Sequence, residues 1–349
     1  MNTFYSVQLF SRIRRSLCPS ICRRPKPTSA SVRSSSILCA GILPSVLVLS
    51  APHAALAGLH IQPVFIGGTP PPSAIAGGGD LREIFQVAAE AWEGVFQQGG
   101  GKWNITIEFC WSDTGTQFGR EELLEQGGNP VRITRSRVFF RNTAAQGGPD
   151  TFPGWFADPT PRDNSEYLTY TAYRASVTGG QLNVGRVYSD GTGDAAGRID
   201  LLTIATHEIG HALGLDNGYT GFQDQFQQGL FIAITPPRPY AGLEVILSSF
   251  GPHIDGFGST PLMVPDPTPG WRQLISAVDG LVIAQISSFN RPDLNSPAQL
   301  AMLSSAGRAP AKTMLKEPRA LPAGPMSAET IQAGIDASGA ERPRRPGSH

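Results

Sequence analysis

The spacing of apolar residues predicts a helix that begins just after Asp80. Apolar side chains recur there at helical intervals, at Leu81, Ile84, Phe85, Val87, Ala88, Ala91, Trp92 and Val95. Asp80 is a suitable N-cap, because its carboxylate can accept hydrogen bonds from the free N–H groups of the first turn. A glycine-rich stretch at 98–101 ends the pattern. We therefore expect an amphipathic helix that packs on a core.

Three later segments alternate between apolar and polar residues and are expected to be strands. They cover residues 103–111, 132–141 and 182–188, and a turn-rich stretch at 189–197 closes the last one. Two further segments, 199–215 and 271–287, are apolar enough for buried helices. The order of helix, strands and helix, without an internal repeat, predicts an α+β domain of two lobes over residues 80–289.

The two ends of the chain differ in composition from this domain. Residues 1–57 hold seven basic residues and no acidic one, with an apolar run at 37–49 and the small-residue site Ala55-Leu56-Ala57. This order is typical of a secretory signal peptide, so we expect a secreted or periplasmic protein. The apolar run is too short for a stable membrane anchor. Residues 58–79 form a Gly/Pro-rich lead-in, and 290–349 are expected to be a disordered Pro/Ala/Arg-rich tail.

Composition narrows the class of protein further. With 40 glycines and 30 prolines the chain is unsuited to a helical bundle. Its formal net charge of zero is an average, because residues 58–289 carry 13 basic and 23 acidic side chains, a net charge of −10. An acidic domain disfavours nucleic acid as a partner. Removal of residues 1–57 would leave Cys110 as the single cysteine, so no internal disulfide is expected.

Candidate chemistry lies in the helix predicted at 199–215. His207 and His211 are four residues apart, so one helical face presents both imidazoles to a single point. Together with Glu208 they form the H-E-x-x-H arrangement of zinc hydrolases. The flanking residues are apolar, and two histidines with a carboxylate are costly to bury without a partner. The pattern therefore favours a metal site over a helix with solvated histidines.

Residues 207–214 resemble the H-E-x-x-H-x-x-G motif of the metzincin clan of zinc peptidases, in which Gly214 would let the chain turn sharply out of the helix. Most members of that clan carry a third histidine three residues after this glycine, where this chain has Asn217, a poor zinc ligand. The resemblance implies a two-lobed catalytic domain with a mixed twisted sheet, an active-site helix and a C-terminal helix.

The resemblance also points to His253 as the third metal ligand. His60 lies in the lead-in and His349 in the tail, which leaves His253 as the remaining candidate in the exported chain. Ten residues further on, 262–265 resembles the methionine turn that lies beneath the zinc in metzincins, with Met263 as its methionine. A distant third histidine before that turn is the leishmanolysin-like spacing, which exported bacterial relatives share.

Two other third ligands stay open. Asp216 would ligate as in the snapalysin-like branch, and Glu244, in a helix-like segment at 243–246, would ligate as in thermolysin-like enzymes. A calcium site at Asp190, Asp194 and Asp200 is also considered, although their spacing is not that of an EF-hand loop and favours a solvated turn.

The resemblance implies an exported, monomeric zinc endopeptidase that acts on protein or peptide substrates. One Zn²⁺ ion would activate a water molecule, and Glu208 would be the general base. Substrates of the clan bind along a strand edge, for which 132–141 is the candidate, and residues 265–271 would line the pocket beyond the scissile bond. The alternative is a non-catalytic exported metal-binding or adhesion protein that retains the fold.

Overall fold

The computed structural model describes residues 58–71, 75–97, 101–143, 152–226, 230–249, 251–295 and 314–316. The expected signal peptide at 1–57 and most of the expected tail lie outside the described residues. Helices and several small sheets combine in the described part, so the α+β class predicted from the sequence is confirmed. None of the helices described is long and apolar enough to cross a membrane.

A four-stranded sheet packs against the first helix. The elements are β1 (Leu59–Gly67), α1 (Leu81–Val95), β3 (Trp103–Ser112), β4 (Gly119–Gly127) and β5 (Arg132–Arg141). The strand order is β1-β3-β5-β4, in which the first three strands are parallel and β4 runs antiparallel to β5. The helix begins as the sequence predicts, because the side chain of Asp80 accepts a hydrogen bond of 2.9 Å from the N–H of Arg82.

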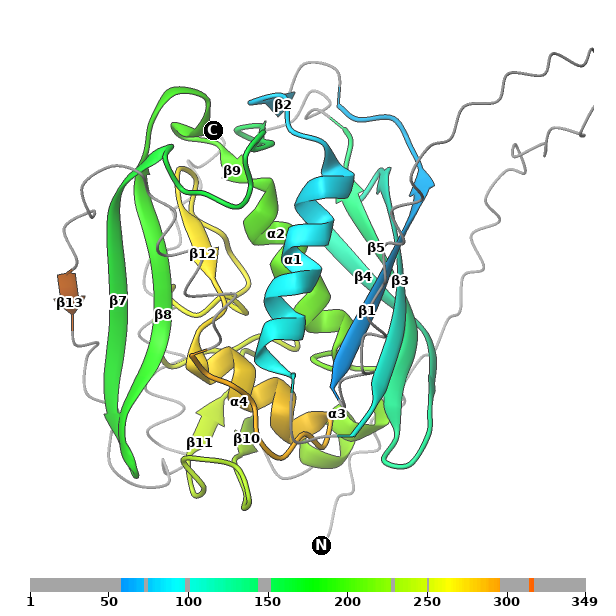
Figure 1. Ribbon diagram of the computed structural model, residues 1–349, viewed down its shortest axis with the longest axis vertical. Helices are drawn as coiled ribbons and strands as arrows, with labels where there is room; N and C mark the ends of the chain where they lie inside the picture. The colour runs from blue at the N-terminus through cyan, green and yellow to red at the C-terminus, as the bar shows by residue number, and fades with distance from the viewer. Residues whose placement is uncertain are drawn as a thin grey trace, which may run out of the picture. The chain divides into compact units, whose positions relative to one another are not determined.

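The central element is α2 (Leu201–Ala212), all of whose residues are buried. Figure 1 shows α1 and α2 side by side, between the sheet of β1, β3, β4 and β5 and the hairpin of β7 and β8. Trp92 of α1 donates from Nε1 to the carbonyl oxygen of Thr206 at 2.8 Å, which ties the two helices together in the core. A buried helix that packs on its neighbours in this way is held rigidly.

The remaining elements surround this centre. A second sheet has the order β12-β8-β7-β13, formed by β7 (Tyr167–Val177), β8 (Gly180–Gly191), β12 (Arg272–Leu274) and β13 (Met314–Lys316). Three two-residue strands, β2 (Ile75–Ala76), β6 (Trp155–Phe156) and β9 (Ile199–Asp200), make a third. The last pairs β10 (Phe231–Ala233) with β11 (Glu244–Ile246). The other helices are η1 (Gly193–Ala195), α3 (Thr220–Phe226) and α4 (Ala277–Ile286).

The prediction of one continuous helix over 271–287 is wrong at its start. Residues 272–274 form β12 instead, and the capping box of Ser276 and Asp279 starts α4. The reason lies in Arg272, whose fully buried guanidinium pairs with Asp158 at 2.6 Å and Asp200 at 2.9 Å. A buried cation requires such partners, so the strand is fixed by contacts from distant segments.

Three of the longer strands, β1, β4 and β7, lie where the sequence pattern predicts none. β1 falls in the lead-in at 58–79 and pairs with β3 in the main sheet. β4 is not predicted because it is an edge strand with largely polar residues. β7 is not predicted because its Thr and Tyr residues interrupt the apolar–polar alternation. The helix-like segment at 243–246 is a strand, β11, and three residues of the expected tail form β13 beside β7.

Candidate metal centre

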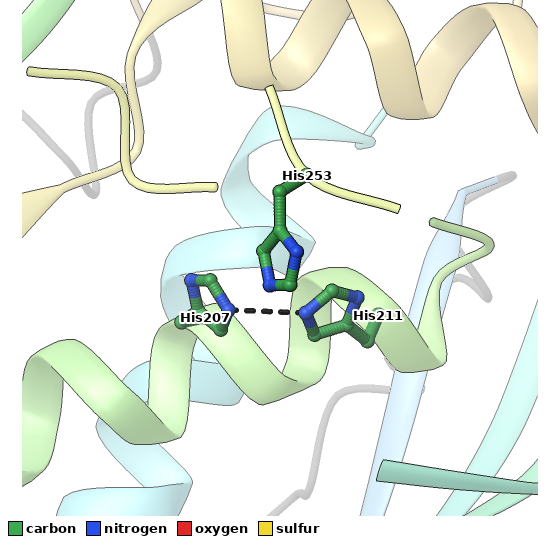
Figure 2. A group of neighbouring side chains, drawn as sticks. All are labelled: His207, His211 and His253. Carbon is green, nitrogen blue, oxygen red and sulfur yellow. Dashed lines mark hydrogen bonds between the residues drawn. The ribbon is translucent and has the colours of Figure 1, made fainter. Parts of the chain in front are cut away.

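Three histidines from two segments meet at the centre of the molecule. His207 and His211 come from one face of α2, and His253 comes from the loop before the isolated bridge residue Ile254. One nitrogen from each ring lies within 4.8 Å of the other two. Figure 2 shows the ring of His253 pointing between the rings of His207 and His211. Three buried or partly buried imidazoles are therefore close enough to bind one metal ion.

Backbone carbonyls fix the tautomers of the two helical histidines. Nδ1 of His207 donates to the carbonyl oxygen of Leu262 at 2.9 Å, and Nδ1 of His211 donates to that of Leu215 at 2.6 Å. Because a carbonyl oxygen only accepts, each Nδ1 carries the proton and each Nε2 presents a lone pair. The two Nε2 atoms face each other at 3.0 Å, an arrangement that a cation between them would stabilise.

Gly214 makes the hydrogen bond of His211 possible. This glycine has a φ of +129°, a value that side chains other than hydrogen rarely allow, so the chain can turn out of α2 at this point. The turn brings the carbonyl of Leu215 back to Nδ1 of His211. The sharp turn expected at Gly214 is confirmed, and it orients a candidate ligand.

His253 is held through its backbone and not through its ring. Its carbonyl accepts from the N–H of Ser248 at 2.8 Å, and the next residue, Ile254, donates to the carbonyl of Met263 at 2.7 Å. Its ring centroid lies 5.3 Å from that of His207 and 4.9 Å from that of His211. Nδ1 of His253 is buried without a hydrogen-bond partner among the described residues. Figure 2 shows the other ring nitrogen, Nε2, directed toward the rings of His207 and His211, so this nitrogen is the one placed to bind a metal ion.

The charge state of the three rings suits metal binding. Burial, with a smaller contribution from the neighbouring histidines, lowers the pKa of His207, His211 and His253 to about 3. The rings are therefore neutral at physiological pH, as metal ligands must be. Three neutral nitrogens with one open position match the donor set of a catalytic zinc site, since structural zinc sites are closed by four protein ligands.

Met263 contacts α2 at Gly210, one residue before the candidate ligand His211. The methionine is fully buried, and a Cβ placed on Gly210 would overlap its Sδ and lie 2.9 Å from its Cε. Gly210 is a residue that the sequence pattern missed. The sequence did contain a signal, because Gly210 lies inside a predicted buried helix. Glycine destabilises a helix, so its presence there indicates that close packing leaves no room for a side chain.

Glu208 faces a cavity of about 420 Å³ that opens beside the histidines. Burial raises the pKa of this carboxyl group to about 8, so it holds a proton far more strongly than an ordinary glutamate. The side chain rests against the backbone of β4, because a Cβ on Gly119 would lie 2.7 Å from Cδ of Glu208. A buried carboxyl group with a raised pKa next to a metal site is suited to proton transfer.

The wall of this cavity corrects the expected substrate edge. β5 is an inner strand, flanked by β3 and β4, so residues 132–141 offer no free edge. β4 ends the sheet, and its beginning lines the cavity together with the residues before it: Thr116, Gln117, Phe118, Gly119, Arg120 and Glu121. Part of the expected pocket at 265–271 also lines the cavity, through Pro265, Asp266 and Pro267.

Glu121 is a second acidic group in this wall that the sequence pattern missed. Burial, followed by the proximity of Asp216 and Glu208, raises its pKa to about 9, against the hydrogen bond from Ser136. Its Oε2 is buried without a partner among the described residues. The position of Glu121 could not be inferred from the sequence, because β4 itself was not predicted.

The other candidate ligands are placed differently. Asp216 and Asn217 line the cavity, but the metal-binding group found among the described residues holds the three histidines alone. Glu244 lies on β11 and is not among the residues that line the cavity. Asp200 is engaged by Arg272 and Thr203, and Asp190, Asp194 and Asp200 do not form a metal-binding group among the described residues.

Comparison of the chain with protein-family models, with curated proteins and with solved structures finds no match. The function therefore has to be argued from the site itself.

Proposed function

We propose that the protein is a zinc-dependent endopeptidase. The observation that carries this proposal is the convergence of His207, His211 and His253 beside the buried Glu208, in a cavity that opens along the edge strand β4. Three neutral histidines and an adjacent carboxyl group form the donor and base set of a hydrolytic metal site. The residues present thus fit a zinc ion.

A bound zinc ion would supply Lewis-acid activation of water and of the substrate carbonyl. Glu208 would accept a proton from the attacking water and pass it to the leaving amine. Burial raises the pKa of Glu208, and a nearby cation would lower it, so that the carboxylate would be ionised to accept the proton of the water and could then release that proton to the amine. One carboxyl group can serve both steps because it lies at the cavity wall beside the three rings.

The substrate would bind as an extended strand along β4. The strand pairs with β5 on one side, and the structure describes no partner on its other side. Backbone hydrogen bonds to such an edge give affinity without regard to sequence. Beyond the histidines, Val264, Pro265 and Pro267 would contact the side chain that follows the scissile bond.

The order of the helices and of the candidate ligands along the chain supports a metzincin-like fold, which is part of the same proposal. α2 would be the active-site helix, 262–265 the methionine turn and α4 the C-terminal helix. Export through an N-terminal signal peptide, a monomeric state and a proteinaceous substrate belong to the proposal as well, and rest on the sequence.

The test is cleavage of casein or gelatin by the purified protein. We expect activity that a chelator removes and that added zinc restores. Stoichiometric zinc binding without cleavage of either protein, or of a mixed peptide library, would favour a non-catalytic metal-binding or adhesion protein and contradict the proposal.

A further inference from the structure

A single peptide group connects the candidate ligand His207 to a buried carboxylate. The carbonyl oxygen of Leu262 accepts the hydrogen bond from Nδ1 of His207 at 2.9 Å. The N–H of the same peptide group, which belongs to Met263, donates to Oδ1 of Asp279 at 3.0 Å. His207, the peptide group and Asp279 are thus joined in series through both ends of one planar amide.

Asp279 lies at the start of α4 and is fully buried. Its Oδ2 accepts from the N–H of Leu262 at 3.0 Å, from the N–H of Ser276 at 2.8 Å and from the hydroxyl of Ser276 at 2.7 Å. Burial raises the pKa of Asp279, whereas these hydrogen bonds oppose the rise because they stabilise the charged form. The three converging backbone N–H groups can only donate, and they stabilise the ionised carboxylate, which accepts at both oxygens.

We propose that Asp279 is a positioning residue for the metal site, acting on His207 through the Leu262–Met263 peptide group. The inference rests on the proposed function, because it assigns His207 to the zinc ion. In this role Asp279 never touches substrate or metal. In many zinc sites a carboxylate hydrogen-bonds the second nitrogen of a zinc-ligating histidine directly. Here Asp279 would have the same effect through the intervening peptide group.

The physical effect has two parts. An anion at the N–H end of a peptide group draws that group's electrons toward the carbonyl oxygen, and hydrogen bonds in such a chain strengthen one another. The stronger acceptor pulls on the proton at Nδ1 of His207 and makes Nε2 a better donor to a metal ion. The second hydrogen bond, from Leu262, fixes the direction in which the carbonyl points.

His211 provides an internal comparison. Its Nδ1 donates to the carbonyl of Leu215, and among the described residues no carboxylate accepts from the N–H at the other end of that peptide group, which belongs to Asp216. Of the two helical histidines, His207 is therefore the one whose hydrogen bond leads through a peptide group to a carboxylate. A change at Asp279 should act on His207 and leave His211 unaffected.

The experiment compares Asp279→Asn with Ser276→Ala in the full-length protein. Both variants disturb the cap of α4, but Ser276 hydrogen-bonds Asp279, whereas Asp279 itself accepts from the N–H groups of Leu262 and Met263. Zinc affinity is measured by competition with a chelator, and the Nδ1–H resonances of His207 and His211 are recorded by NMR in the zinc-loaded protein. For Asp279→Asn we expect zinc affinity to fall about 10- to 100-fold. The His207 resonance should move upfield while that of His211 stays in place.

Ser276→Ala removes one hydrogen bond to Asp279 but keeps the carboxylate and its contacts with the Leu262–Met263 peptide group, so it should lose much less zinc affinity and shift the His207 resonance much less than Asp279→Asn. Equal losses of affinity in the two variants, or an unchanged His207 resonance in Asp279→Asn, would overturn the proposal. If Asp279→Asn does not fold, the test is made on the zinc-loaded wild type by NMR couplings across two hydrogen bonds, from His207 Nδ1 to Leu262 and from Met263 N–H to Asp279. The absence of either coupling would overturn the proposal. Zinc data as expected, in a protein that cleaves no peptide, would refute the proposed function and leave this inference standing.

Discussion

Gly210 and Met263 are in direct contact in the core, and the contact leaves no room for a side chain on the glycine. A Cβ on Gly210 would overlap Met263 Sδ, lie 2.9 Å from its Cε and meet Trp92 at 3.2 Å. The second variable position of the H-E-x-x-H sequence is therefore fixed by packing.

Gly210→Ala is expected to destabilise the protein. Alanine favours a helix over glycine by about 1 kcal/mol. An added methyl group in a tightly packed core costs about 1–3 kcal/mol, because neighbouring atoms must move. We expect a lower thermal midpoint and weaker zinc binding, measured by calorimetry and chelator competition. Adding Met263→Ala to Gly210→Ala should partly relieve the crowding. A Gly210→Ala protein that is as stable as the wild type would contradict this packing account.

Glu208→Gln tests the role of the carboxyl group. The amide has the same shape but cannot accept the proton of the attacking water, so kcat/KM for a peptide substrate should fall at least about 100-fold. Zinc content should stay at the wild-type value, because Glu208 is not a ligand in this account. Gln117→Glu is a matched control that adds a carboxylate to the same cavity wall, and it should not restore activity to Glu208→Gln.

Glu121→Gln should change the pH dependence of stability. In the folded protein the pKa of Glu121 is raised from 4.5 to about 9, so between these values the folded state binds more protons than the unfolded state. The stability of the metal-free wild type should then fall as pH rises through this window, by up to about 1.4 kcal/mol per pH unit from this group. The glutamine resembles the protonated form and removes this dependence.

Denaturant unfolding of the metal-free proteins at about pH 5 and about pH 8 measures the effect. The free energy of unfolding of Glu121→Gln should exceed that of the wild type by a larger amount at the higher pH than at the lower pH. Glu122→Gln, on the exposed face of the same strand, should show the same small difference at both values. An advantage of Glu121→Gln that is equal at both pH values would show that the carboxyl group titrates normally.

The sequence predicted those parts of the molecule that depend on local patterns. The periodicity after Asp80 predicts α1, and alternation predicts β3 and β5. The buried helix carrying His207 and His211 was expected over 199–215, but it spans Leu201–Ala212, because Ile199–Asp200 form β9. His253 was singled out as a candidate by counting histidines and by its distance from Met263, and the structure places its ring beside the other two.

What the sequence could not provide depends on contacts between distant segments. β4 has few apolar residues because it is an exposed edge, so neither the strand nor the position of Glu121 was visible. The series from His207 to Asp279 runs through backbone atoms, which every residue has and no motif records. The strand at 272–274 is held by the pairing of Arg272 with Asp158 and Asp200, far away in the chain.

The central claim is that His207, His211 and His253 hold one zinc ion. The most direct measurement is the zinc content of purified wild type, His253→Ala and Asp216→Ala, each loaded with excess zinc and dialysed. We expect one equivalent of zinc in the wild type and in Asp216→Ala, and loss of stoichiometric zinc in His253→Ala. Full zinc content in His253→Ala, or an empty site in Asp216→Ala, would contradict the account.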